Sequence, residues 1–99
     1  MLTNSEYHSL KTRLEKVMNA RIRQKKITAI YVNSAHHWQP PLVIKVGEKC
    51  ANLEKDTPPE KIIAIFETTT FLVCTQKRGI ENDLPYFFSR EDVTRVVES

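Results

Sequence analysis

The first twenty positions of the chain carry apolar and polar residues with the period of an amphipathic helix. The apolar positions follow one another at intervals of three, four, three and one, and they are Tyr7, Leu10, Leu14, Val17 and Met18. Residues at these intervals lie in one stripe on a helix. Thr3 and Glu6 form a Thr-x-x-Glu capping box in front of the stripe. The pattern predicts a helix over about residues 4–20 whose stripe faces a core.

Beyond residue 26 the pattern changes to short runs of β-branched and aromatic residues, which favour strands. The runs that predict strands are 27–32, 42–46, 62–66, 71–75, 85–89 and 93–97. A helix followed by short antiparallel strands predicts an α+β domain, mostly β, that is built around a small barrel or a strongly bent sheet.

The length of 99 residues predicts one domain, 1–99. Within it, we expect residues 1–24 to form the helix and the positively charged connection that leads from it to the first strand. Residues 34–61 form a long variable segment, because two proline pairs interrupt it and proline blocks helices and central strands. All apolar runs are far shorter than the roughly 20 residues of a membrane span. The N-terminus is polar from Thr3 onward, so we expect a cytoplasmic protein without membrane attachment.

Charge is distributed unevenly along the chain. Residues 1–49 contain nine Lys or Arg against three Asp or Glu, whereas residues 50–99 contain six against nine. Four of the positive charges stand within six residues, at Arg21, Arg23, Lys25 and Lys26. Such a cluster can neutralise the phosphates of a nucleic acid, but cations also suit the C-terminal end of a helix. Charge alone leaves both interpretations open.

The chemistry-bearing side chains show no catalytic pattern. His36 and His37 are adjacent and Cys50 lies downstream, which raises a metal- or thiol-dependent enzyme as one alternative. A zinc site needs about four ligands at motif-like spacings, however. No known motif couples Cys50 or Cys74 to a base. We therefore expect no enzyme, no metal site and no cofactor, and two reduced thiols.

Three stretches stand in an informative order. The first, residues 19–33, passes from a helix end through the four cations into a strand. The second joins Ile65-Phe66-Glu67 to Thr70-Phe71-Leu72-Val73. Here an acidic residue precedes a bend, and an aromatic residue begins the strand that follows the bend. The third is Ser89-Arg90-Glu91-Asp92-Val93-Thr94-Arg95-Val96-Val97, a turn before a final strand. In this order they resemble the Sm-like family, and its bacterial Hfq branch in particular, over about half of the chain.

The resemblance implies a fold and a function. The fold is an N-terminal helix that caps a small, bent, five-stranded antiparallel barrel of the SH3-like kind, and barrels of this family assemble into rings that bind U-rich or A-rich RNA. This chain would be a divergent member with a long insertion at 34–61, acting on single-stranded RNA as a chaperone or regulator.

The resemblance also implies roles for single residues. The rim contacts to RNA phosphates would be Arg21, Arg23, Lys25 and Lys26. Phe71 would stack on a base and Thr70 would stand where the family has a polar base-reading residue. Arg90 and Glu91 replace the Lys-His pair with which Hfq recognises uridine, and a carboxylate cannot donate to a base as histidine does. We therefore expect Arg90 to contact RNA, and we expect polyanion binding rather than uridine recognition.

Self-association is part of the same expectation. In a ring the edge strands of neighbouring subunits pair, which removes exposed edges, and we expect strands 85–89 and 71–75 at this seam. An alternative function is a protein–protein adaptor on a small SH3-like barrel. In that alternative the loop His36–Pro41 recognises the partner, because Trp38 suits an interface anchor.

Overall fold

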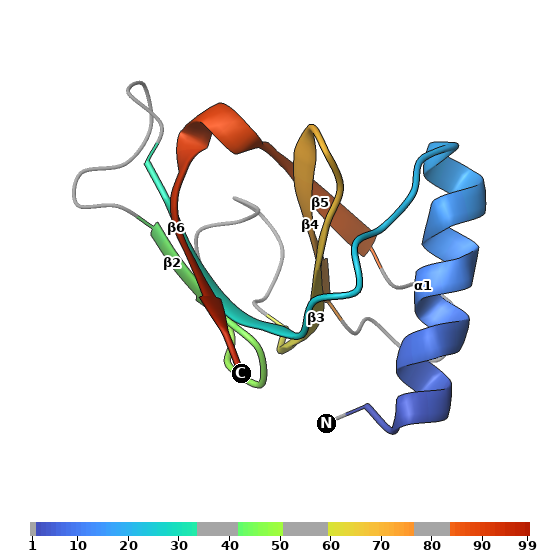
Figure 1. Ribbon diagram of the computed structural model, residues 1–99. Coiled ribbons are helices and arrows are strands. Elements are labelled where there is room, and N and C mark those ends of the chain that lie inside the picture. The colour runs from blue at the N-terminus through green and yellow to red at the C-terminus, as the bar shows by residue number, and fades with distance from the viewer. Residues whose placement is uncertain (1, 34–41, 51–59, 77–83) are drawn as a thin grey trace.

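The computed structural model describes residues 2–33, 42–50, 60–76 and 84–99 of the chain (Figure 1). The described elements, in chain order, are α1 (Asn4–Met18), β1 (Ile27–Val32), β2 (Leu42–Lys45), β3 (Ile62–Glu67), β4 (Phe71–Gln76), β5 (Leu84–Ser89), the short 3-10 helix η1 (Arg90–Asp92) and β6 (Val93–Glu98). All six predicted strands are present, and each bound differs by at most one residue from the prediction. The loop His36–Pro41, and with it the adaptor and metal alternatives, lies outside the described residues.

Helix α1 begins at the predicted capping box. The Thr3 hydroxyl accepts a hydrogen bond from the Glu6 backbone N–H, and the Glu6 carboxylate accepts one from the Thr3 N–H, both at 3.1 Å. The helix ends two residues earlier than predicted, because Asn19 takes a left-handed conformation with φ of 50° and caps it. Val17 was expected in the core-facing stripe, which is wrong: its side chain is 73% exposed. Met18 takes the core side of this turn, and a neighbouring residue points about 100° away.

The strands form two antiparallel three-stranded sheets, with the orders β2-β1-β6 and β3-β4-β5. Helix α1 lies against the second sheet (Figure 1). The α+β class is therefore confirmed. The expected barrel of five strands is not what the described hydrogen bonds give, because six strands form two sheets that do not close on each other.

The two sheets meet where β2 ends. The Val46 N–H donates to Thr28 O of β1 at 2.9 Å, and the next N–H, that of Gly47, donates to Ile62 O of β3 at 2.7 Å. Gly47 has a φ of 87°, which a side chain would make costly. Residues 46 and 47 therefore join β1 of the first sheet to the start of β3 in the second sheet through backbone hydrogen bonds.

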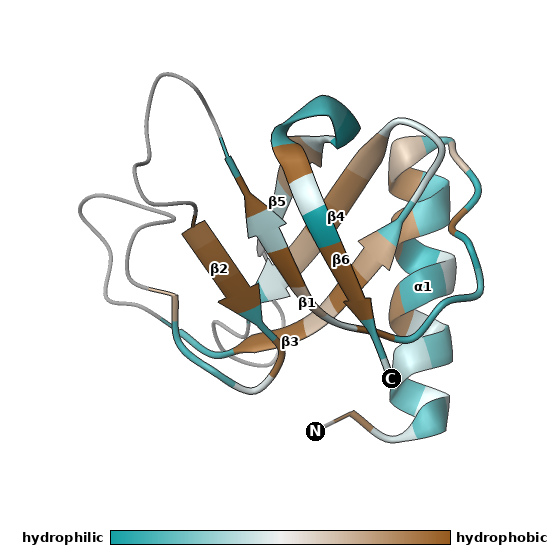
Figure 2. Ribbon diagram, turned by 60° about the vertical axis from the view of Figure 1, so that its left-hand side comes forward, coloured by the Kyte–Doolittle hydropathy of each residue, from teal (hydrophilic) through white to brown (hydrophobic). Residues whose placement is uncertain are grey.

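Two apolar clusters hold these layers together. One lies between the sheets and includes Ile30, Ile44, Ile65, Leu72 and Cys74. The other lies between α1 and the second sheet and consists of Leu10, Leu14, Ile22, Ala64, Phe66 and Val73. The Tyr7 ring packs on Phe66 with 5.1 Å between ring centroids. Figure 2 shows the same division, with hydrophobic colour on the strands and a hydrophilic outer side on α1.

The packing of α1 gives a stability prediction. Leu14→Ala removes buried methyl groups from the second cluster, so we expect a loss of about 2–5 kcal/mol in the free energy of unfolding. Val17→Ala on the same helix is the control, and it should change that free energy by about 0.5 kcal/mol or less because Val17 is exposed. Urea denaturation followed by circular dichroism measures both. Equal losses for the two variants would contradict the placement of α1.

Candidate nucleic-acid interface

The basic segment, residues 21–26, is fixed to the fold rather than free at a helix end. Ile22 is buried among the residues between α1 and the second sheet, and its N–H donates to the Glu15 carboxylate at 3.0 Å. The Arg23 N–H donates to Glu67 O at 2.8 Å. The Tyr7 hydroxyl donates to Lys25 O at 3.2 Å. These bonds attach the segment to α1 on one side and to the end of β3 on the other.

The carboxylate of Glu67 lies at the centre of a charged cluster. Its side chain is 1% exposed, and its Oε1 is 3.0 Å from Arg90 Nη1 and 3.4 Å from both Arg23 Nη1 and Lys25 Nζ. We call these four residues the Glu67 cluster. No described group makes a hydrogen bond of good geometry to Oε1, so the three cations compensate its charge by proximity. A buried carboxylate without such partners would be very unfavourable.

The cluster keeps a positive surplus. Three cations face one buried carboxylate, and the second carboxylate nearby, that of Glu98, is exposed and 3.6 Å from Lys25 Nζ. All three cationic side chains remain partly exposed, while Glu67 is covered. The surface that solvent meets is therefore the positive part of the cluster.

The turn between β3 and β4 leads from Glu67 to an exposed aromatic pair, whose rings lie on the opposite face of the second sheet from the Glu67 side chain. The Thr68 hydroxyl accepts hydrogen bonds from the Thr70 and Phe71 N–H groups at 3.3 and 3.0 Å. The Arg90 N–H donates to Thr70 O at 3.1 Å, which ties η1 to this turn. Phe71 is 43% exposed, and its ring meets that of Phe87, 49% exposed, edge to face at 6.3 Å between centroids.

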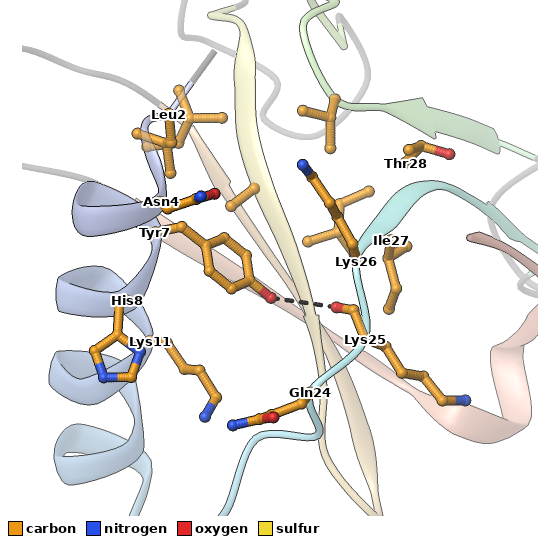
Figure 3. A pocket seen from close by; sticks show the side chains of 14 residues that line it. Leu2, Asn4, Tyr7, His8, Lys11, Gln24, Lys25, Lys26, Ile27 and Thr28 are labelled. Atoms are coloured by element: carbon orange, nitrogen blue, oxygen red, sulfur yellow. Dashed lines mark hydrogen bonds between the residues drawn. The ribbon is translucent and has the colours of Figure 1, made fainter. Parts of the chain in front are cut away.

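Of the seven residues that the sequence points to, the structure brings Arg23, Lys25 and Arg90 together on Glu67. Thr70 is joined to Arg90 by a backbone hydrogen bond, and Phe71 follows Thr70 at the start of β4. We call this group, with Glu67 and Phe87, the basic site. Lys26 turns instead into a cavity beside α1 (Figure 3). Arg21 is exposed and pairs with no carboxylate of the described residues.

Sequence reasoning missed two members of the basic site. Glu67 was read as part of an acidic bend, and its burial under three cations was not foreseen. An acidic residue that ends an apolar strand, as in Ile65-Phe66-Glu67, is the signal that could have found it. Phe87 was not singled out, because it stands in the predicted strand 85–89 directly before another phenylalanine, Phe88.

The thiols and histidines offer no reactive centre in the described part of the chain. Burial, and then the nearby Cys50, raise the pKa of the Cys74 thiol well above its ordinary value, which makes it inert as a nucleophile. Among the described residues no three His, Cys, Asp or Glu side chains gather to hold a metal ion. The described part also contains no helix that is long and apolar enough to cross a membrane.

Compared with protein-family models, with curated proteins and with solved structures, the chain has no match. The function is therefore argued from the basic site itself.

The Glu67 cluster gives a prediction for stability. Glu67→Gln leaves three cations close together without their carboxylate, so we expect unfolding to become about 1–3 kcal/mol easier. Added salt should recover part of this loss, because it screens the repulsion among partly exposed cations. Urea denaturation at low and high NaCl measures both effects.

The matched control is Glu48→Gln. Its carboxylate is exposed and 4.0 Å from Lys45, and such surface pairs contribute about 0–1 kcal/mol. A Glu67→Gln variant as stable as the unmodified protein, or one whose loss is the same at all salt concentrations, would show that the cations do not depend on Glu67.

Proposed function

We propose that this chain is an RNA-binding protein that holds single-stranded RNA on the basic site. The observation that carries the proposal is the convergence of Arg23, Lys25 and Arg90 on one buried carboxylate at the end of the sheet whose other face exposes Phe71 and Phe87. Positive charge next to aromatic surface is the combination that single-stranded nucleic acids need, since phosphates take the cations and bases take the rings.

The cations of the Glu67 cluster would take the phosphates. An arginine has five N–H donors, and the contact with Glu67 involves Nη1 of Arg23 and Nη1 of Arg90. The outer donors are oriented by that contact and can meet phosphate oxygens in pairs. Glu67 itself does not repel the RNA strongly, because it is covered and its charge is compensated.

The exposed ring of Phe71 would take a base. Stacking of a base on an aromatic side chain is worth about 1–3 kcal/mol, and Phe87 beside it widens the apolar surface. Arg90, which stands where Hfq carries the lysine of its uridine-reading pair, turns its guanidinium toward Glu67. This supports contact with phosphate rather than with the edge of a uracil.

The strand order supports an Sm-like interpretation of the fold. If β2 and β3 are the two halves of one bent strand, the six strands become five in the single order β6-β1-β2/β3-β4-β5, after an N-terminal helix. This is the number of strands and the position of the helix that the resemblance implies. The variable segment predicted at 34–61 would then include an insertion at the bend of that strand.

The same order revises the expected seam of the ring. β4 is hydrogen bonded to β3 on one side and to β5 on the other, so it has no free edge and strand 71–75 cannot lie at a seam. The outer strands of the combined order are β5 and β6. We propose that β5 of one copy pairs with β6 of the next, which would also cover the half-buried Tyr86, Phe88 and Val97.

RNA binding is tested by removing two cations while Lys25 remains with Glu67. For Arg23→Ala/Arg90→Ala we expect weaker binding of a labelled oligo(U) or oligo(A) and a flatter dependence of log K on log salt, by about 0.7 per lost phosphate contact. Fluorescence anisotropy over a series of NaCl concentrations measures the slope. Circular dichroism establishes that the variant is folded.

The charge-matched control for this measurement is Lys45→Ala/Lys49→Ala. Both lysines are exposed and lie at the end of β2, away from the basic site. This variant should keep the slope of the unmodified protein. If the slope of log K against log salt becomes flatter by the same amount in both double variants, binding depends on net charge alone and the basic site has no special role.

Self-association is tested by sedimentation. The chain has a mass of 11.5 kDa, and a ring requires a particle of several times that mass at micromolar concentration, in the absence of RNA. A stable monomer under these conditions would refute the ring while leaving RNA binding by the basic site to the anisotropy measurement.

A further inference from the structure

A cavity of about 370 Å³ lies between α1, the basic segment and β3, and the exposed residues Asn4, His8 and Gln24 are part of its lining (Figure 3). Its walls come mainly from α1, residues 24–28 and β3, and Leu2 and Val46 complete them. Tyr7 extends into it from the helix and reaches the basic segment through its hydrogen bond to Lys25 O. The volume is at the lower end of the range of about 300–1,000 Å³ for small-molecule pockets.

One side chain in this cavity is unusual. Lys11 is only 8% exposed and yet makes no ion pair or hydrogen bond with any residue in the described part of the chain. The covered part is the hydrocarbon stem, because Lys11 Nζ is not among the buried described atoms that lack a hydrogen-bond partner, and its ammonium therefore keeps access to solvent at the mouth of the cavity. In Figure 3 Lys11 extends from α1 toward the segment that carries Gln24, whose amide can donate to the same place. Lys11 is thus a cation held at the wall of a cavity without a counter-charge.

The other lining residues determine the charge and the polarity of the cavity wall. Lys26 adds positive charge, and no Asp or Glu is among the described residues that line the cavity. Lys25 also lines it, but its ammonium points away from α1 and pairs with Glu67 and Glu98. The remaining wall is mostly aliphatic and includes Leu2, Ile27 and Ile63. A cation at the wall of an aliphatic cavity is complementary to a molecule with one acidic group and an apolar body.

We propose that this cavity binds a small amphiphilic carboxylate, whose acid group pairs with Lys11 and whose hydrocarbon body packs on the aliphatic wall. The carboxylate would supply the counter-charge that Lys11 lacks, and the body would fill space that apolar side chains leave open. The site does not depend on RNA binding, because Lys11 is no member of the basic site.

Octanoate below its micelle-forming concentration is a suitable probe, and isothermal titration calorimetry measures its binding to the full chain. For Lys11→Met, which keeps the length of the side chain and removes its charge, we expect affinity to fall at least about tenfold. The control is Lys16→Met, since Lys16 is exposed on the same helix and outside the cavity, and it should bind as the unmodified protein does. Octanol, which lacks the charge, should bind the unmodified protein more weakly than octanoate.

Two-dimensional NMR locates the probe. On octanoate addition the amide signals of Ile27, Ile63 and Ala64 should shift in the unmodified protein and much less in Lys11→Met. The proposal is overturned if octanoate does not bind, if Lys11→Met binds it as well as Lys16→Met does, or if uridine monophosphate binds the cavity more tightly than octanoate. Lys11→Met should retain RNA binding, so failure here and failure of the basic site are distinguishable.

Discussion

The buried carboxylate of Glu67 is the constraint on which the arrangement of this chain depends. A charge covered from solvent must be compensated within a few ångströms, and here Arg23, Lys25 and Arg90 supply the compensation. These cations belong to the segment after α1 and to η1, which leads into β6. The need to compensate this one carboxylate therefore holds three parts of the chain together at Glu67. They are the segment after α1, the end of β3 in the second sheet, and η1, through which the chain returns to the first sheet.

The need to compensate Glu67 also explains how this small fold holds its surface cations in fixed positions. Lysine and arginine side chains on a surface normally sample many rotamers, and ordering them costs entropy. Contact with Glu67 reduces that freedom before any ligand arrives, since each cation already has one partner. Because three cations share one carboxylate, the outward charge stays positive. The proposed RNA binding uses these preorganised cations together with the exposed rings of Phe71 and Phe87 across the end of the second sheet.

Much of the fold could be predicted from sequence, because local pattern and tertiary structure agree. The Thr3–Glu6 capping box starts α1 where expected, and each β-branched run forms a strand. The partition of the strands into two sheets could not be predicted, since it depends on backbone pairing between distant segments, such as Gly47 with Ile62. β4 was expected at an edge and is central, because alternation of apolar residues does not reveal which strands lie on either side.

The basic site could be predicted only in part, for a similar reason. Charge density and order of motifs pointed to Arg23, Lys25 and Arg90, but nothing local says that their side chains meet at Glu67, which lies more than forty residues from Arg23 along the chain. Lys11 shows a different limit. It follows Tyr7 by four residues and precedes Leu14 by three, so helical spacing places it at the edge of the apolar stripe, but the cavity beside it forms only where α1 packs on the basic segment and β3.

The most direct test of this account is to map where RNA touches the protein. Titration of an isotope-labelled sample with a short single-stranded RNA, followed by two-dimensional NMR, reports each backbone amide. The account predicts the largest shifts at Arg23, Lys25, Thr70, Phe71 and Arg90, and their reduction at high salt. Shifts confined to the outer face of the β2-β1-β6 sheet, or no shifts at low salt, would contradict it.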